Sequence, residues 1–99
     1  MKKDETIIKF IERLKLVLNF TLLEIVDYWE ADLCAVGLKN GNRLVYISTF
    51  NYVEEDEPAY DFDLELLDQN SRNRIEIIKE GRRVSESELI DEVKVFLGG

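Results

Sequence analysis

Three carboxylates at alternate positions, Asp61, Asp63 and Glu65, come nearest in this chain to a catalytic or metal-binding set. In an extended strand they share one face and lie about 7 Å apart. Such oxygens suit Mg²⁺ or Ca²⁺, and carboxylate pairs about 5–9.5 Å apart serve glycoside hydrolysis. A metal needs convergent ligands, however, and an acid catalyst needs a cleft that raises its pKa. Because a strand presents its carboxylates in an open row, we predict no metal, no cofactor and no catalysis at this segment.

The other candidate for chemistry is Cys34, in a chain that contains no histidine. Without histidine, Ser–His and Cys–His nucleophilic systems are excluded, and so are His-ligated metal sites. A reactive thiol also needs a cationic neighbour, whereas Cys34 lies between Leu33 and Ala35. We therefore expect a buried, small apolar side chain and a protein that is not an enzyme. A metal-dependent hydrolase that uses the three carboxylates is the enzymatic alternative.

The formal net charge of −8 is concentrated in one segment, which we call the acidic window (residues 44–71). It contains no lysine or arginine and 8 acids, while the remaining 13 acids and all 13 basic residues lie outside it and cancel. The 8 acids are Glu54, Glu55, Asp56, Glu57, Asp61, Asp63, Glu65 and Asp68. Such a field attracts cations or basic proteins and repels nucleic-acid phosphates and anionic lipids. The alternative is a solvated acidic loop followed by a strand with one wet face.

A chain of 99 residues predicts a single globular domain over residues 1–99. Asp4 and Glu5 interrupt any apolar signal segment after Met-Lys-Lys, and no apolar run approaches 18 residues, so we expect no membrane association. One cysteine fits a reducing compartment, and we expect a cytoplasmic protein.

Helical patterns lie at both ends of the chain. Residues 4–18 carry an apolar stripe with Asp4 as a possible N-cap, and Asn19 follows as a breaker. Ser85 to Glu88 forms a capping box, and Gly98 suits the C-terminal end of the second helix.

Five strands are predicted between these helices, at residues 20–29, 33–39, 43–49, 60–67 and 74–79. Asn40-Gly41 predicts a type I′ turn that pairs the second strand with the third. The fourth strand alternates, with Tyr60, Phe62, Leu64 and Leu66 inward and the three acids outward. Gly81 is expected to end the fifth strand.

The element order is therefore α-β-β-β-β-β-α, an α+β fold with a five-stranded antiparallel meander. The N- and C-terminal helices should both pack on one face of the sheet. The second face should stay partly open and carry Asp61, Asp63 and Glu65, with Glu24, Val26 and Tyr28 from the first strand.

The chain resembles the small immunity proteins found beside bacterial toxins. The resemblance lies in its shortness and acidity, its end helix, its run of strands with Tyr46-Ile47-Ser48-Thr49 and Tyr60-Asp61-Phe62-Asp63, and its closing helix over residues 85–97. It implies the role of an inhibitor and transfers no residue assignments, because these proteins have several unrelated folds.

The leading hypothesis is thus a non-enzymatic acidic protein that binds a basic partner, such as a toxin with a cationic active site. Aromatic residues are enriched at interface hot spots, and tyrosines accompany the acids here. The expected contact residues are Glu54, Glu55, Asp56, Glu57, Asp61, Asp63, Glu65, Tyr46, Tyr52 and Tyr60.

Two other binding functions remain open. The first is a nucleic-acid mimic that blocks a DNA-binding protein, for which eight acids are few. The second is a homodimer or other self-assembled module, formed through Leu22, Val26 and Tyr28 on the second sheet face.

Overall fold

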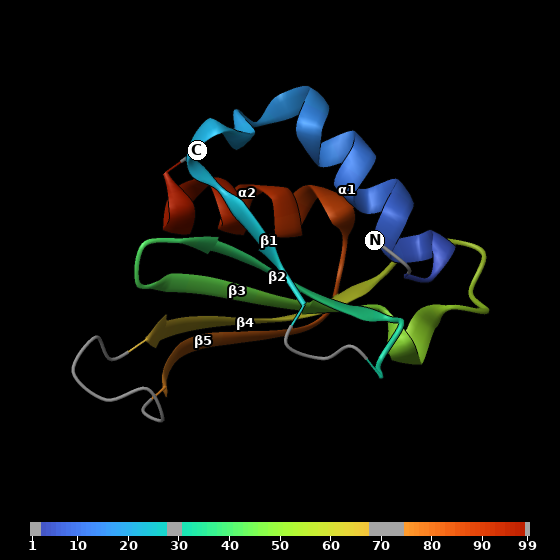
Figure 1. Cartoon of the computed structure of the whole chain (residues 1–99). Coiled ribbons are helices and arrows are strands. Elements are labelled where there is room, and N and C mark those ends of the chain that lie inside the picture. The colour runs from blue at the N-terminus through green and yellow to red at the C-terminus, as the bar shows by residue number, and fades with distance from the viewer. Residues whose placement is uncertain (1–2, 28–30, 68–74, 99) are drawn as a thin grey trace.

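The computed structural model describes residues 3–27, 31–67 and 75–98, and its elements follow the predicted order (Figure 1). Helix α1 spans Glu5–Val17 and helix α2 spans Glu86–Leu97. The strands are β1 (Glu24–Val26), β2 (Ala35–Asn40), β3 (Arg43–Ser48), β4 (Tyr60–Leu67) and β5 (Ile75–Val84). Two short 3₁₀ helices, η1 (Phe20–Leu22) and η2 (Phe50–Tyr52), lie in the connections.

The five strands form one antiparallel sheet in the order β1-β2-β3-β4-β5. Both helices cover the same face of this sheet (Figure 1). The core between helices and sheet joins Phe10 and Leu14 of α1 to Leu89 and Val93 of α2, with Phe62 of β4 beneath them. The α+β meander with both helices on one face is therefore confirmed.

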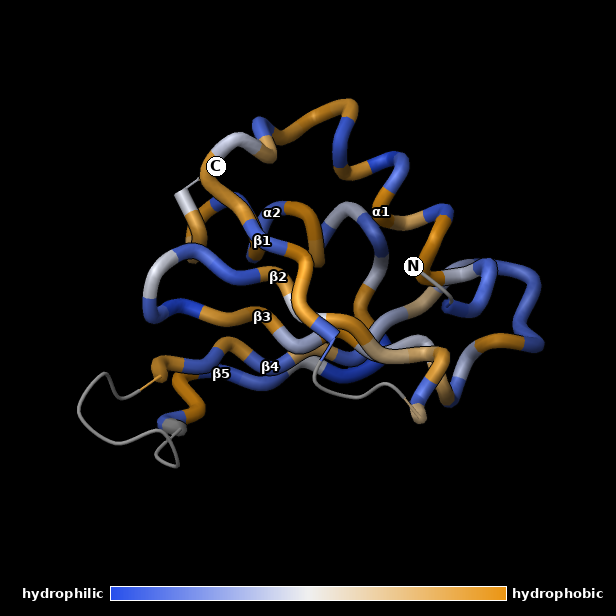
Figure 2. The backbone as a smooth tube through the Cα atoms, in the orientation of Figure 1, coloured by the Kyte–Doolittle hydropathy of each residue, from blue (hydrophilic) through white to orange (hydrophobic). Residues whose placement is uncertain are grey.

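Local signals explain the helix ends. Asp4 caps α1 by accepting a hydrogen bond from the Thr6 backbone N–H at 2.9 Å, which satisfies a donor that has no partner inside the helix. Apolar and polar residues alternate along α1 with helical spacing (Figure 2). Ser85 caps α2, and Gly98 follows it with the left-handed φ of +66° that favours glycine.

The β2–β3 hairpin is confirmed, but its turn lies one residue later than predicted. Asn40 pairs with Arg43, so the two loop residues are Gly41 and Asn42. Only Gly41 has a positive φ, +62°, which is the pattern of a type II′ turn rather than type I′.

The first predicted strand was too long. Residues Phe20–Leu22 form η1, because the Asn19 side chain accepts a hydrogen bond from the Thr21 N–H at 2.9 Å and closes a turn. Strand β1 then covers only Glu24–Val26, and Tyr28 lies outside the described residues.

The fifth strand, in contrast, was predicted too short. Strand β5 continues through Gly81 to Val84 and pairs with the whole length of β4. Gly81 does not end the strand. It pairs with Phe62 of β4, and the Phe62 ring occupies the space that a side chain at position 81 would need. A Cβ at Gly81 would sit 2.0 Å from Phe62 Cε1.

Two register shifts between β4 and β5 mark β-bulges, one between the pairs formed by Tyr60 and Phe62. Within this bulge Arg83 has a φ of +50°, the one positive φ among the described non-glycine residues. The bulge sets Arg82 and Arg83 beside the acids of β4. No helix among the described residues is long and apolar enough to cross a bilayer.

Candidate functional site

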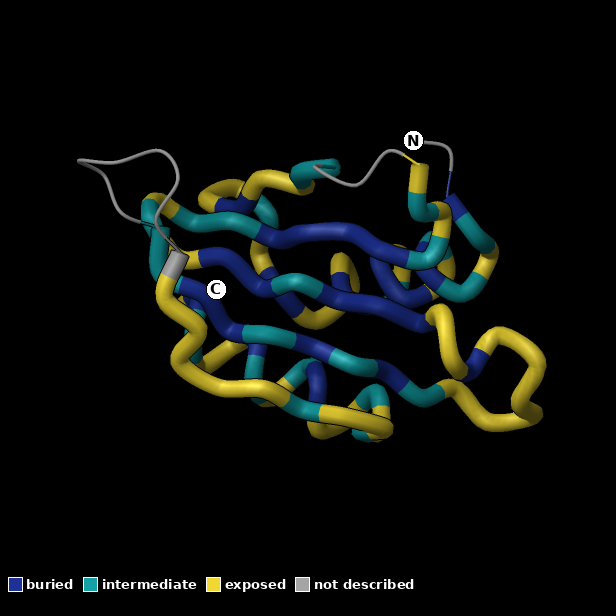
Figure 3. The backbone as a smooth tube through the Cα atoms, turned by 90° about the horizontal axis from the view of Figure 1, so that it is seen from below, coloured by how far each residue is buried: buried dark blue, intermediate teal, exposed yellow. Residues whose placement is uncertain are grey.

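The acidic loop (residues 54–57) projects from one end of the sheet, between η2 and β4. All four of its side chains are exposed, and Figure 3 shows this segment as an exposed projection. Within the described part of the chain, Glu54, Asp56 and Glu57 form no hydrogen bond or ion pair. Three uncompensated carboxylates therefore stand in solvent next to one another.

The fourth acid of the loop, Glu55, is tied to β5. Arg83 Nη1 lies 2.8 Å from Glu55 Oε1, and the Arg83 guanidinium lies over the Tyr52 ring, 4.9 Å from its centroid. A cation over an aromatic face is attracted by the ring quadrupole. Arg83 thus connects the acidic loop, η2 and the β4–β5 bulge.

Asp61 and Asp63 lie on the second sheet face, as predicted, but both have internal partners. Asp61 accepts hydrogen bonds from the Tyr52 hydroxyl at 2.5 Å and from the Arg83 backbone N–H at 3.1 Å. Asp63 forms an ion pair with Arg82 at 3.1 Å. Arg82 therefore offsets the charge of Asp63, while the hydrogen bonds to Asp61 come from neutral groups, and both acids hold the bulge in place.

Glu65 occupies a different environment from the other two acids of its row. The sheet register places it between Leu44 of β3 and Ile77 of β5, and the residue is only 8% exposed. Burial, and secondarily the charge of Asp63, raise the pKa of Glu65 above its usual value. Glu24 and Val26 of β1 lie on this same face, as expected. They pair across the sheet with Lys39 and Gly37 of β2, respectively, and the same cross-strand rows continue into β3.

The three carboxylates of β4 thus do not converge on a common point. The described part of the chain holds no group of three or more acidic or cysteine side chains arranged to bind a metal ion. Cys34 is half-buried, and burial together with the charge of Asp4 raises its pKa, which favours the thiol over the nucleophilic thiolate.

The three tyrosines of the predicted contact set lie in three different environments. Tyr46 lies half-buried on the second face, opposite Asp63, while Tyr52 is 8% exposed under Arg83. Tyr60 points into the core with 1% exposure, so little of its surface is available to a partner. The alternation of β4 already contained the reason, because Tyr60 shares the inward positions of Phe62 and Leu64.

Tyr60 instead joins the two helices to the sheet. Its hydroxyl donates a hydrogen bond to Glu86 Oε1 at 2.8 Å. The Arg13 guanidinium of α1 donates hydrogen bonds to both oxygens of the same carboxylate at 2.7–2.9 Å. Burial, followed by the bond to Glu86, raises the pKa of Tyr60. Burial also acts to raise the pKa of Glu86, but the bonds from Arg13 and Tyr60 outweigh it and leave that pKa below its usual value.

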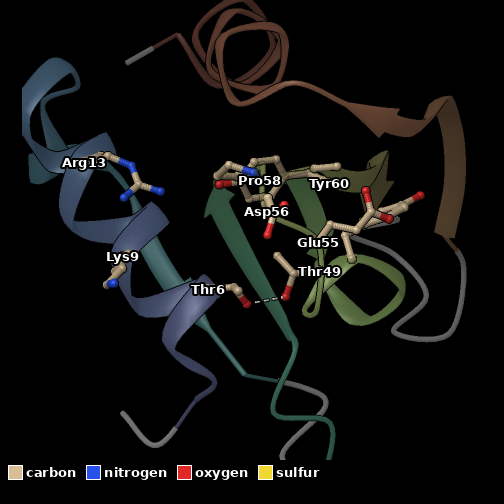
Figure 4. Close-up of a pocket in the computed structure, with 10 residues that line it drawn as sticks. Thr6, Lys9, Arg13, Thr49, Glu55, Asp56, Pro58 and Tyr60 are labelled. Atoms are coloured by element: carbon tan, nitrogen blue, oxygen red, sulfur yellow. Dashed lines mark hydrogen bonds between the residues drawn. The ribbon is translucent and has the colours of Figure 1, made fainter.

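A cavity of about 240 Å³ opens between α1 and the acidic loop (Figure 4). Thr6, Lys9 and Arg13 come from α1, and Asp56 and Pro58 are among the residues of the opposite wall. The two walls meet where the Thr6 and Thr49 hydroxyls lie 2.7 Å apart. Close by, the Asp4 N–H donates to Leu33 O at 2.8 Å and holds the start of α1 against the sheet.

Arg82 and Arg83 are the residues whose importance sequence reasoning missed. The acids nearest to this pair in sequence are Glu80, Glu86 and Glu88. Only Glu80 contacts Arg82, at 3.3 Å, while the stronger contacts join acids 19 and 28 residues away. The signal available in the sequence was limited to two adjacent arginines that directly follow Gly81.

Comparisons of the chain with protein-family models, with curated proteins and with solved structures find no match. What the chain does must therefore be inferred from its own residues and contacts.

Proposed function

We propose that this protein is a non-enzymatic acidic binding domain that inhibits a basic partner protein, such as a bacterial toxin with a cationic active site. The observation that carries the proposal is the acidic loop, where Glu54, Asp56 and Glu57 stand exposed and unpaired in the described structure. Unpaired carboxylates on a projecting loop attract a cationic surface and accelerate encounter with it.

The internal pairing of the other acids narrows this contact surface. Asp61 and Asp63 hold the bulge, and Glu65 is buried, so their contribution to a partner is secondary. The proposed contact is centred on residues 54–57, with Glu55 and Tyr52 beside Arg83 at its border. This pattern also argues against nucleic-acid mimicry, because three free carboxylates in one loop do not follow a phosphate backbone.

Self-association was expected to use Leu22, Val26 and Tyr28. Leu22 lies in η1 rather than in the sheet and Val26 lies in β1, while Tyr28 lies outside the described residues. We favour a basic partner over a second copy of this chain because the unpaired carboxylates of the acidic loop attract a cationic surface.

Affinity capture from the source cells tests the proposal. The test variant is Glu54→Lys/Asp56→Lys/Glu57→Lys, which reverses the loop charge and keeps Asp61. The matched control is Glu12→Lys/Glu24→Lys/Asp91→Lys, the same charge change at exposed acids that form no ion pair within the described structure.

The proposal requires that a basic protein be retained by the wild type and the control variant and lost with the loop variant. Purified, that protein must also lose activity when the wild type is added. A partner that both variants retain equally, or one whose activity is unaffected, would contradict the proposed function.

A further inference from the structure

We propose that the cavity between α1 and the acidic loop is an anchor pocket for one arginine side chain of the basic partner. The inference rests on the proposed function and makes it specific. The cavity, about 240 Å³, is smaller than the roughly 300–1,000 Å³ typical of small-molecule sites. Its size therefore suits a single long side chain rather than a cofactor.

Of the charged residues that line the cavity, all but one have an ion-pair partner in the described structure. Lys9 pairs with Glu5 at 2.9 Å, Arg13 with Glu86 at 2.7 Å, and Glu55 with Arg83 at 2.8 Å. Asp56, the remaining charged residue of the lining, has no partner among the described residues. Figure 4 shows its side chain directed into the space beside the Thr6–Thr49 pair. The pocket thus presents one uncompensated negative charge.

The hydroxyl groups where the two walls meet have their hydrogens already committed. Thr6 Oγ1 donates to Asp4 Oδ2 at 2.6 Å, so the hydrogen in the 2.7 Å contact between the threonines must come from Thr49. Both oxygens then have lone pairs only, and of the two residues Thr49 is buried at 2% exposure while Thr6 is half-buried, so Thr6 Oγ1 is the acceptor that a ligand can reach. A ligand that donates several hydrogen bonds and accepts none matches this arrangement.

Arginine combines these requirements. Its guanidinium is a planar cation with five N–H donors and no acceptor, so it can pair with Asp56 and still reach a threonine oxygen. Its aliphatic stem can lie along Pro58 and Ala59, which also line the cavity. The charges of Lys9 and Arg13 weaken the site, although each is offset by its own carboxylate. We therefore expect a free arginine derivative to bind with a dissociation constant of about 1–10 mM.

NMR titration of the ¹⁵N-labelled protein tests the pocket without the partner. The probe is N-acetyl-arginine N-methylamide, and the matched neutral probe is N-acetyl-citrulline N-methylamide, which keeps the shape and loses the charge. We expect saturable chemical-shift changes at the amides of Thr6, Thr49, Asp56 and Ala59. The affinity for the citrulline probe should be about tenfold lower, a difference of about 1.4 kcal/mol, because that probe lacks the charge that pairs with Asp56. N-acetyl-lysine N-methylamide should bind more weakly than arginine.

Two variants locate the effect. Asp56→Asn should weaken arginine binding about tenfold, while Glu57→Gln, one residue away and equally exposed and unpaired, should change it less than twofold. Circular dichroism checks that both variants are folded. Linear, non-saturating shifts, equal binding of citrulline, or an unchanged affinity of Asp56→Asn would each overturn the anchor pocket.

These outcomes are separate from those of the proposed function. If the arginine probe fails but the charge-reversed loop still loses the partner, the anchor is wrong and the acidic contact stands. If the probe binds as expected but no basic protein is captured, the pocket stands and the inhibitor function falls.

Discussion

Arg83 Nη1 donates to both oxygens of Glu55, at 2.8 and 3.0 Å, and so ties the acidic loop to the bulge of β5. Both side chains are more than one third exposed, at 64% and 38%, so the ion pair adds at most about 1 kcal/mol to stability. Its effect is to tie Glu55 to the guanidinium that lies over Tyr52, while the three other carboxylates of the loop remain exposed and unpaired within the described structure.

Removing this tie should loosen the loop without unfolding the domain. In Arg83→Gln we expect faster amide hydrogen exchange at residues 54–57 and a loss of stability no larger than about 1 kcal/mol. Arg82→Gln is the matched control, because Arg82 contacts Asp63 and Glu80 rather than the loop. Equal exchange in the two variants would show that Arg83 does not position the loop.

Association with a basic partner should depend on salt. Exposed charges are screened over about 8–10 Å at physiological ionic strength, so raising salt from about 0.05 to 0.5 M should slow association much more than it changes dissociation. Replacing the four loop acids by Gln or Asn should mimic this effect and leave the fold intact. Stopped-flow or biosensor kinetics measure both rates, and a salt-independent association rate would remove the acidic loop from the contact.

A substitution on the inward side of β4 should behave in the opposite way. Phe62 is 2% exposed in the core, so Phe62→Ala should cost about 3–5 kcal/mol in the free energy of unfolding. Urea denaturation of this variant and of the neutralised loop variant separates the structural face of the segment from its charged loop.

The close approach of Phe62 to Gly81 predicts a coupled pair. Gly81→Ala should destabilise the protein by about 1–3 kcal/mol or more, because the added methyl group overlaps the Phe62 ring. In a Phe62→Leu background the same change should cost clearly less, since the smaller side chain leaves room for it. A double-mutant cycle of unfolding free energies measures the coupling, and additive costs would be inconsistent with the contact.

The Arg13–Glu86–Tyr60 network should make part of the stability pH-dependent. The folded-state pKa of Glu86 lies below its unfolded value, so its contribution is present above about pH 4.3 and is lost as the pH falls through the folded-state pKa. Glu86→Gln should therefore be less stable than the wild type at pH 7, by about 1 kcal/mol given the partial exposure of Arg13. Urea denaturation at pH 7, 5 and 3 should show this difference shrinking at the lowest pH. A constant difference would mean that the carboxylate charge is not what matters.

Patterns confined to a few neighbouring residues were sufficient to predict much of the fold. The caps at Asp4 and Ser85, the left-handed residue at Gly98 and the alternation of residues 60–64 are all found where the sequence placed them, whereas the alternation breaks at Glu65, which is buried. They were predictable because each depends on hydrogen bonds or side-chain periodicity within one element. The exposed acidic loop was predictable for a similar reason, since a run of four acids before a proline has no way to be buried.

Tertiary structure decided the features that depend on residues far apart in the chain. Strand β5 passes through Gly81 because the Phe62 ring of another strand occupies the space over it, and Arg83 reaches Glu55 across 28 residues because the bulge turns it there. Glu65 is buried between neighbours that only the sheet register brings together, and the Tyr60 hydroxyl meets Glu86 across 26 residues. Local propensity contains no information about such neighbours. The sequence alone therefore located the negative charge, and the packing of the elements determined which of the described carboxylates have internal partners and which have none.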